Sequence, residues 1–484
     1  MEWRGYKDER GDGTHFTGCQ GSKILNFSVD KVAKSFKLPI SKLEIDYSRH
    51  NELPEGSSLT DEEVSYLRND VEIMSRALDI MFKSGLNKMT IGSDALSYYK
   101  SINKHFNDFF PIFSTEIDGY LRESYRGGFT YLNPKYKEKE TGKGIVLDVN
   151  SLYPSVLHNE LMPYDYPIFY TGKYVEDKEY PLYIQKITCS FKVKKGKIPS
   201  LQLKNYSLVF MENEYIEDSF GEEYTFTLTS VDLDLFFSQY DVDNLTYEYG
   251  YKFKGIHGLF TAYIDKWTEE KIKAKKEGNA GMYTISKLLL NSLYGKFGTN
   301  PKTRRKFPFL EDEVVRYALH EEEIKDPIYV PIASFCTSYA RKKTILTSQA
   351  IRDYSLEKYG EDYYVYSDTD SIHCLFDVEE VEDGVYKFLE KDKELNEIID
   401  IDDYKLGAWK IESRYQKGSY IRQKCYIELG YDNKLNVVVA GLPKKLAHKV
   451  NFDNFNSNLS VDGKLTFKHT KGGIVLVETT FSIK

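Results

Sequence analysis

Two short apolar runs in this chain end abruptly in carboxylates, and this feature most constrains how the chain can fold. In GKGIVLDVNSLYPS an Ile-Val-Leu run leads directly to Asp148, and in YYVYSDTDSIHCLF a similar run leads to Asp368 and Asp370. Short continuous apolar runs are typical of buried strands. Residues 363–373 therefore predict a pair of buried strands with two acids at the tip between them.

The three acids predict a divalent metal site. Carboxylates at the ends of adjacent buried strands repel each other unless a cation lies between them. Oxygen ligands without a histidine cluster favour Mg²⁺ or Mn²⁺, with open positions for water and substrate phosphates. The more ordinary alternative is that Asp368 and Asp370 are turn residues, because Asp is common at hairpin tips.

A third segment, SKLLLNSLYGKFG, predicts a helix with two distinct faces. Lys287, Asn291 and Tyr294 lie on one face, whereas an apolar stripe of Leu289, Leu293 and Phe297 lies on another. A lysine directed into a site with metals and carboxylates favours a triphosphate ligand, because its ammonium neutralises phosphate oxygens. The alternative is an ordinary surface lysine.

Length and composition narrow the class of protein. The 484 residues are enough for two or more domains. The net charge of -8 does not indicate nucleic acid, but phosphate binding needs basic residues gathered on one surface rather than a basic total. No run of about 18 apolar residues and no apolar leader are visible, so we expect a cytoplasmic protein. Isolated cysteines predict a reduced, intracellular chain: Cys19, Cys189, Cys336, Cys374 and Cys425.

Sequence patterns predict helices early in the chain and strands later. The first two dozen residues are polar without periodicity, and we expect them to be poorly ordered. Ser28 and Thr60 are predicted to cap two helices, the second with Glu63 three residues on. Further helices are expected over 261–297 and about 335–354, β-like runs follow Tyr125, and the tail TKGGIVLVETTFSIK predicts a hairpin.

These stretches resemble the family B DNA polymerases, and more narrowly the protein-primed branch of phages and linear plasmids. DVNSLYPS resembles motif A of that family, KLLLNSLYG resembles motif B and YSDTDS resembles motif C, in the family's order. YRGG, TSYAR and KCY are three further matches. The resemblance runs from about Ile24 to Lys484.

The resemblance implies a role for each matching residue. Asp148 and Asp370 would hold two catalytic ions, Mg²⁺ or Mn²⁺, with Asp368 as a supporting carboxylate and Lys287 stabilising the triphosphate. Tyr153 would exclude a 2′-hydroxyl by its bulk. The nucleotide site would comprise Ser151, Leu152, Tyr153, Asn291, Tyr294 and Gly295, and the DNA and primer contacts would comprise Tyr125, Gly127, Gly128, Thr337, Arg341, Lys424 and Tyr426. For Tyr366 we expect core packing.

The family's exonuclease domain is represented only in part. YLRND, with Tyr66 and Asp70, resembles the third exonuclease motif, and Lys42 matches a further family position. The first two motifs have no counterpart, and one Asp cannot hold a two-metal site, so we expect no proofreading. The chain is either a fragment, which we favour because a half-domain exposes strand edges and apolar faces, or a natural short form.

The implied fold class is α+β, a right-hand polymerase of palm, fingers and thumb with a mainly helical remnant of a ribonuclease H-like exonuclease domain. The implied division is an exonuclease remnant at 1–90, a first palm part with motif A at 91–164, a terminal-protein-type insertion at 165–260, fingers at 261–298, a second insertion at 299–330, a second palm part with motif C and KxY at 331–440, and a thumb at 441–484.

Basic clusters give a possible DNA path, although most charge runs are only solvated faces. We expect one cluster on a hairpin, one on the loop after motif B and one near the C-terminus. They are Lys192, Lys194, Lys195 and Lys197; Lys302, Arg304, Arg305 and Lys306; and Lys444, Lys445 and Lys449.

The sequence therefore predicts a monomeric DNA-templated DNA polymerase that uses deoxynucleotides and a terminal protein as primer. One alternative is a fragment that only binds DNA or terminal protein. Another is an RNA-dependent polymerase, which also places paired acids on a hairpin. Tyr153 and the full SLYPS and NSLYG strings argue against that alternative.

Overall fold

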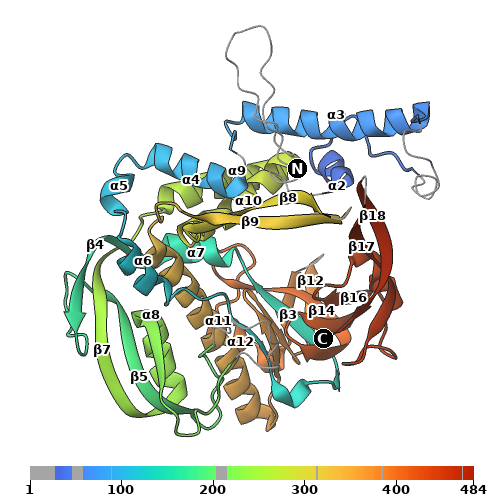
Figure 1. Cartoon of the computed structure of the whole chain (residues 1–484). Helices are drawn as coiled ribbons and strands as arrows, with labels where there is room; N and C mark the ends of the chain where they lie inside the picture. The colour runs from blue at the N-terminus through green and yellow to red at the C-terminus, as the bar shows by residue number, and fades with distance from the viewer. Residues whose placement is uncertain are drawn as a thin grey trace. The chain divides into compact units, whose positions relative to one another are not determined.

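The chain divides into two units, and both carboxylate-ended runs lie in the second. The first unit comprises Met1–Phe106 and Leu259–Lys296, and the second comprises Asn107–Gly258 and Phe297–Lys484. This computed structural model describes residues 28–45, 58–88, 90–202, 215–311, 314–382, 385–470 and 473–483 (Figure 1). Cys19 and the predicted irregular start of the chain lie outside these residues.

Helices form the described part of the first unit. They are α2 (Val29–Ser35), α3 (Asp61–Lys83), α4 (Ile91–Ile102), α9 (Thr261–Lys276) and α10 (Ala280–Phe297), whose last residue belongs to the second unit. Ser28 caps α2, and Thr60 with Glu63 forms a complete capping box on α3, as the sequence predicts. The helical stretch expected over 261–297 is two helices, because the chain turns at Gly278, which has a φ of 65°.

An antiparallel sheet of eight strands, the largest in the described part of the chain, carries both carboxylate-ended runs. Its order is β1 (Thr130–Leu132), β10 (Tyr364–Asp368), β11 (Ser371–Cys374), β3 (Gly144–Val149), β14 (Trp409–Arg422), β15 (Cys425–Gly430) and β16 (Leu435–Val439), with β2 (Glu140–Thr141) beside β14. The Ile-Val-Leu run in β3 is buried, which confirms the predicted buried strand.

The long helix α11 (Val330–Tyr359) packs against β10 and β11. It is longer at both ends than the predicted 335–354. Pro331 lies in its first turn, where a missing N–H costs nothing, and Gly360 ends it in the left-handed conformation at a φ of 68°. Two shorter helices that contact α11 are α7 (Leu152–Asn159) and α8 (Ser230–Gln239).

A second sheet of four strands lies mostly in the region predicted as the first insertion. Its order is β4 (Met162–Thr171), β7 (Tyr240–Ile256), β5 (Leu182–Val193) and β6 (Tyr224–Thr229). Helix α8 follows β6 directly and packs against this sheet. Figure 1 shows β5 and β7 as neighbouring strands in the lower left of the view.

Three hairpins complete the strands that the structure describes: β8 (Lys302–Glu311) with β9 (Val314–Ile324), β12 (Val378–Glu382) with β13 (Val385–Phe388), and β17 (Ser460–Thr470) with β18 (Gly473–Ser482). The last contains the tail that was predicted to be a hairpin, but the tail supplies only strand β18, and its partner β17 precedes it. The first corrects the predicted loop after motif B, because Lys302 and Arg304 lie on strand β8, where cross-strand pairing such as Arg304 with Glu322 supports a ribbon.

Short helical segments connect these elements. They are α5 (Phe106–Phe109), α6 (Thr115–Arg122), α12 (Leu395–Ile398) and the 3₁₀ turns η2 (Pro134–Tyr136), η3 (Glu390–Asp392) and η4 (Lys444–Lys449). The described cysteines, Cys189, Cys336, Cys374 and Cys425, are buried and free. Within the described ranges, no helix combines the length and the apolar character needed to cross a membrane.

Candidate active site

The two acid-ended runs lie next to each other in the large sheet. Strand β11 pairs with β3 so that Ser371 lies opposite Asp148, and the N–H of Val149 donates to the carbonyl of Asp370 at 2.8 Å. Asp368 ends β10, and Thr369 and Asp370 form the turn to β11. This confirms the prediction that the carboxylates are at the ends of adjacent strands.

A pocket of about 470 Å³ opens where these carboxylates meet. Asp148, Asp368 and Asp370 line it. Glu412 and Lys424 also face the pocket, from β14 and from the turn between β14 and β15. With Glu428, the pocket thus gathers five acidic side chains and one lysine.

The pocket disfavours the charged forms of Asp148 and Asp370. Burial, followed by the charge of Glu412, raises the pKa of Asp148 to about 7, although Lys410, with its ammonium 3.5 Å away, acts in the opposite direction. Burial also raises the pKa of Asp370, and Asp368 and Glu412 add to that effect. Crowded, partly desolvated carboxylates of this kind are stabilised by a cation.

These donors fit a magnesium-type site that is completed by other molecules. In the described part of the chain, no cluster of three or more His, Cys, Asp or Glu side chains has the geometry of a metal site. Magnesium does not need such a cluster, because it usually takes one or two carboxylates and fills its other positions with water and substrate phosphates. Asp148 and Asp370 supply hard oxygen ligands of this type.

Asp368 differs from its two neighbours because a lysine binds both of its oxygens closely. Its two oxygens lie 2.8 and 2.9 Å from the ammonium of Lys424. The hydroxyl of Tyr366 lies 3.5 Å from the same carboxylate and accepts a hydrogen bond from the Lys424 backbone N–H at 2.9 Å. Tyr366 is fully buried, so the predicted core packing is confirmed, and it also carries hydrogen bonds. Tyr426, from the same turn region, lines the pocket.

Motif A continues from β3 into helix α7. Ser151 precedes the helix with a φ of 57°, a left-handed conformation that is uncommon outside glycine. The side chain of Leu152 is buried, so only its backbone can face a nucleotide. Tyr153 is partly buried, and its carbonyl accepts from the thiol of Cys336 at 3.9 Å. The predicted nucleotide contacts of these three residues stay predictions.

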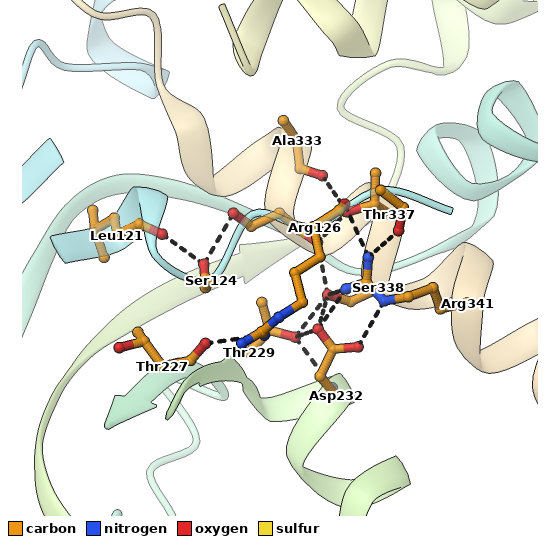
Figure 2. A network of polar contacts seen from close by, with 12 residues as sticks. Leu121, Ser124, Arg126, Thr227, Thr229, Asp232, Ala333, Thr337, Ser338 and Arg341 are labelled. Carbon is orange, nitrogen blue, oxygen red and sulfur yellow. Dashed lines mark hydrogen bonds and ion pairs between the residues drawn. The ribbon is translucent and has the colours of Figure 1, made fainter. Parts of the chain in front are cut away.

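The predicted primer contacts of Thr337 and Arg341 stay predictions. Their side chains are buried, with 1% and 2% exposure, in a polar network between α8, α11 and the YRGG segment (Figure 2). The Thr337 hydroxyl donates to the carbonyls of Ala333 and Ser334, and Arg341 is ion-paired with Asp232. Neither side chain is accessible to DNA in this conformation. The ion pair with the buried Asp232 accounts for the burial of Arg341.

The YRGG segment lies against this network. Arg126 donates to the carbonyl of Thr227 at 3.2 Å, and Tyr125 packs so closely on Gly298 that a Cβ there would lie 2.7 Å from its ring. A Cβ on Gly128 would lie 2.6 Å from Thr369, whereas one on Gly127 would meet nothing. The expected template contacts of Tyr125, Gly127 and Gly128 stay predictions.

The remaining predicted residues lie in the first unit. On α10 the apolar stripe is fully buried, whereas Lys287, Asn291 and Gly295 are exposed and Tyr294 is partly exposed, so the two predicted faces exist. Their roles at the pocket stay predictions. The ammonium of Lys42 lies 2.7 Å from Asp70 and also contacts the Tyr66 hydroxyl at 2.5 Å, so the three exonuclease-type residues cluster.

Sequence reasoning missed Lys410, Glu412 and Asp232. Lys410 lies opposite Asp148 in the β3–β14 register, and Glu412 follows on the same strand after the buried Ile411. The alternation in WKIES was a signal for a strand with polar residues on one face. Its pairing with β3 could not be read from the sequence, and nothing in the segment around Asp232 pointed to a distant arginine.

The basic clusters are largely engaged within the protein. Lys192 pairs with Asp218 at 3.0 Å, Lys194 donates to the Phe237 carbonyl at 2.6 Å, and Lys197 lies 3.6 Å from Asp353. Lys195, Lys444 and Lys445 are exposed, and Lys449 donates to the Asp462 carbonyl. The side chains of Arg305 and Lys306 lie outside the described part of the structure.

Comparison with known proteins agrees with this arrangement. A family model described as DNA polymerase type B, organellar and viral, matches residues 12–375. The DNA polymerase of Bacillus phage phi29 is 42% identical over 502 residues, which cover 99% of this chain and 81% of that protein. The DNA polymerase of Streptococcus phage Cp-1 is 32% identical and covers 96% of this chain.

Solved structures show the same likeness. The structure of phi29 DNA polymerase with primer-template DNA and incoming nucleotide substrates superimposes with a TM-score of 0.84 and 42% sequence identity. The match covers 96% of this chain and 79% of that one, and it confirms the predicted right-hand polymerase fold. Since each of these matches spans most of the sequence, the chain is a DNA polymerase and belongs to the type B family of organelles and viruses.

Proposed function

We propose that this polymerase extends a primer 3′-hydroxyl at the pocket lined by Asp148, Asp368 and Asp370, with Asp148 and Asp370 holding two divalent ions, Mg²⁺ or Mn²⁺. The observation that carries the proposal is the convergence of these mutually repelling carboxylates at the ends of adjacent strands. When bound, such ions lower the pKa of the attacking hydroxyl and offset charge on the triphosphate. Lys424 pairs with Asp368 and orients it as a support.

Other residues select and position the substrates. We infer that Lys287 neutralises oxygens of the incoming triphosphate, and that the ring of Tyr153 excludes a ribose 2′-hydroxyl by bulk. Asn291, Tyr294 and Gly295 line the nascent base pair. Lys424 and Tyr426 hold the primer end, and the YRGG segment holds the template strand. Primer-template DNA and nucleotides bound to the similar phi29 polymerase support these partners.

We also infer that the primer at initiation is a hydroxyl of a terminal protein, and that replication takes place in the host cytoplasm. Similarity to phage polymerases supports this inference. We infer that this chain has no proofreading activity. Among the described residues, Asp70 is paired with Lys42 rather than with other carboxylates. A 3′-mispaired primer should therefore not be shortened by this chain, and release of the mispaired nucleotide would contradict the inference.

Primer extension by the wild type and by Asp148→Ala and Asp148→Asn tests the site. We expect both variants to lose at least about a thousandfold in kcat, because the transition-state charge loses its main electrostatic support. Lys434→Gln is a matched surface control, since Lys434 is exposed and pairs with Asp432 at 3.0 Å, away from the carboxylates of the pocket. Equal extension by wild type and Asp148→Ala would overturn the assignment. Incorporation of ribonucleotides at the deoxynucleotide rate would overturn the role of Tyr153.

A further inference from the structure

A buried ion pair lies on two helices that carry none of the carboxylates of the pocket. Arg341 on α11 and Asp232 on α8 have side-chain exposures of 2% and 9%. The guanidinium binds both carboxylate oxygens, with Nε donating at 3.2 Å and Nη2 at 2.5 Å (Figure 2). The Ser338 hydroxyl donates to the same carboxylate at 2.7 Å. Such a pair is costly to bury unless every group is satisfied.

Most of the remaining N–H groups of the guanidinium donate to the YRGG segment. Nη1 of Arg341 donates to the carbonyl of Arg126 at 3.0 Å and to that of Gly127 at 2.6 Å, and Nη2 also donates to Ser338 at 3.0 Å. The two bonds to Asp232 and these three account for all five N–H donors of arginine. Asp232 thus orients Arg341, and Arg341 fixes two consecutive carbonyls of the segment. Lysine cannot replace this planar fork of N–H donors, because the three donors of its ammonium radiate from one atom.

The same segment abuts the turn that carries the motif C acids. The Thr369 N–H donates to the Phe129 carbonyl at 2.6 Å. The absence of a Cβ on Gly128 allows the chain to approach Thr369 this closely. Thr344, on α11, donates to the Thr369 carbonyl at 2.7 Å from the other side. Thr369 itself has a φ of 62°, a conformation that its β-branched side chain adopts only when neighbours enforce it.

We propose that Asp232 and Arg341 are positioning residues for polymerisation: they hold the 125–128 segment against the Thr369 turn and thereby fix Asp368 and Asp370. The inference rests on the proposed function, which gives those carboxylates their role. It places a determinant of active-site geometry on α8, within the region expected to be an insertion. Although burial raises the pKa of Asp232, the Arg341 guanidinium holds it below its ordinary value, so the pair stays charged at neutral pH.

The double variant Asp232→Leu/Arg341→Met tests this role. It replaces the pair with apolar side chains of similar size, a change that often leaves stability unaltered, and it removes both bonds to the segment. We expect faster amide hydrogen exchange across residues 366–371. We also expect kcat to fall by about tenfold to a hundredfold, while KM for the nucleotide changes by less than about threefold. Arg341→Lys keeps a charge beside Asp232 but not the fork, and should resemble the double variant.

Two results would overturn the proposal. One is a folded double variant with wild-type exchange at 366–371 and wild-type kcat. The other is an unchanged kcat with weaker primer-template binding, which would mean that Arg341 acts on DNA. Hydrogen exchange is measured without any reaction, so the exchange result remains informative even if the metal assignment is wrong. The Asp148 variants test that assignment separately.

Glycine variants test the link between the segment and the turn. Gly128→Ala introduces a Cβ that overlaps Thr369 and should speed exchange at Thr369 and lower kcat, whereas Gly119→Ala, on the exposed face of α6 with no atom within 4 Å, serves as the matched control. Adding Thr369→Gly removes the overlapping atoms and suits the positive φ, so it should restore part of the loss. Unchanged exchange at Thr369 in Gly128→Ala would break the proposed link.

Discussion

Single residues in the pocket are arranged for chemistry at the expense of stability. Asp148 is half-buried beside Glu412 and near Asp370, and its pKa is raised to about 7. Lys410, at 3.5 Å, offsets part of the repulsion. Functional sites commonly carry strain of this kind, because groups that bind a transition state are destabilising when it is absent.

Asp148→Asn should therefore stabilise the protein while it inactivates the enzyme. Without divalent ions, removing one of the repelling charges should raise the free energy of unfolding by about 1–2 kcal/mol, because a neutral amide of the same shape replaces a crowded carboxylate. Thermal unfolding in a chelator measures this change. A lower melting temperature than wild type would show that the Lys410 contact outweighs the repulsion.

Tyr366 provides a contrasting residue in which a hydroxyl contributes stability. It accepts from the Lys424 N–H at 2.9 Å, and Lys424 has a positive φ of 55°. Tyr366→Phe keeps the ring and leaves that N–H without its acceptor, so we expect a loss of about 1 kcal/mol. Urea unfolding of the variant measures it, with Tyr404→Phe, at an exposed position, as a control. No difference between the two variants would mean that the hydroxyl contributes nothing.

At the scale of elements, the contact between α8 and α11 should depend on pH. The folded-state pKa of Asp232 is below its ordinary value, since Arg341 outweighs the effect of burial. An acid whose pKa is lower in the folded state stabilises the fold above its unfolded pKa, which is about 3.9 for Asp. This stabilisation is lost as the pH falls through the folded-state pKa. The pair should therefore stabilise the fold fully at neutral pH and progressively less below about pH 4.

Asp232→Asn is the variant that isolates this contribution. It leaves the Arg341 charge buried without its partner, so we expect a loss of about 3–5 kcal/mol at pH 7. Urea unfolding of wild type and variant from pH 7 to pH 3 should show the two curves converging at the acid end. A difference that stays constant over this range would mean that the cost comes from packing rather than from charge.

The elements differ in how far the sequence predicts them. Caps such as Ser28 and Thr60 are local signals, and both helix starts are where the sequence places them. The strands around Asp148 and Asp370 were also predictable, because each carries its own apolar run. The length of α11 was not, since its central turns are buried among several elements and lack a clear amphipathic period.

The candidate site shows the same limit. Asp148 and Asp370 could be found because their motifs are contiguous, whereas Glu412 joins them only through strand pairing. Arg341 was found by its motif, but its partner Asp232 was not, because Asp232 lies 109 residues away in sequence. Contacts over such separations depend on tertiary packing, which short motifs do not encode.

At the scale of the whole molecule, an acidic chain must gather its free cations to bind DNA. The net charge is -8, and several lysines of the predicted clusters already pair with acids. Lys444 and Lys445 on η4 are exposed. We therefore expect the salt dependence of DNA binding to come from a small set of lysines that includes these two.

Two double variants with the same change in net charge test this expectation. If Lys444 and Lys445 each neutralise one phosphate, Lys444→Gln/Lys445→Gln should reduce the slope of log K against log salt by about 1.8, because each contact contributes about 0.9. Lys192→Gln/Lys197→Gln removes lysines already engaged with Asp218 and Asp353, and should change the slope far less. DNA binding measured over a salt series compares them. Equal slopes for the two variants would mean that only net charge matters and that no lysine path exists on this protein.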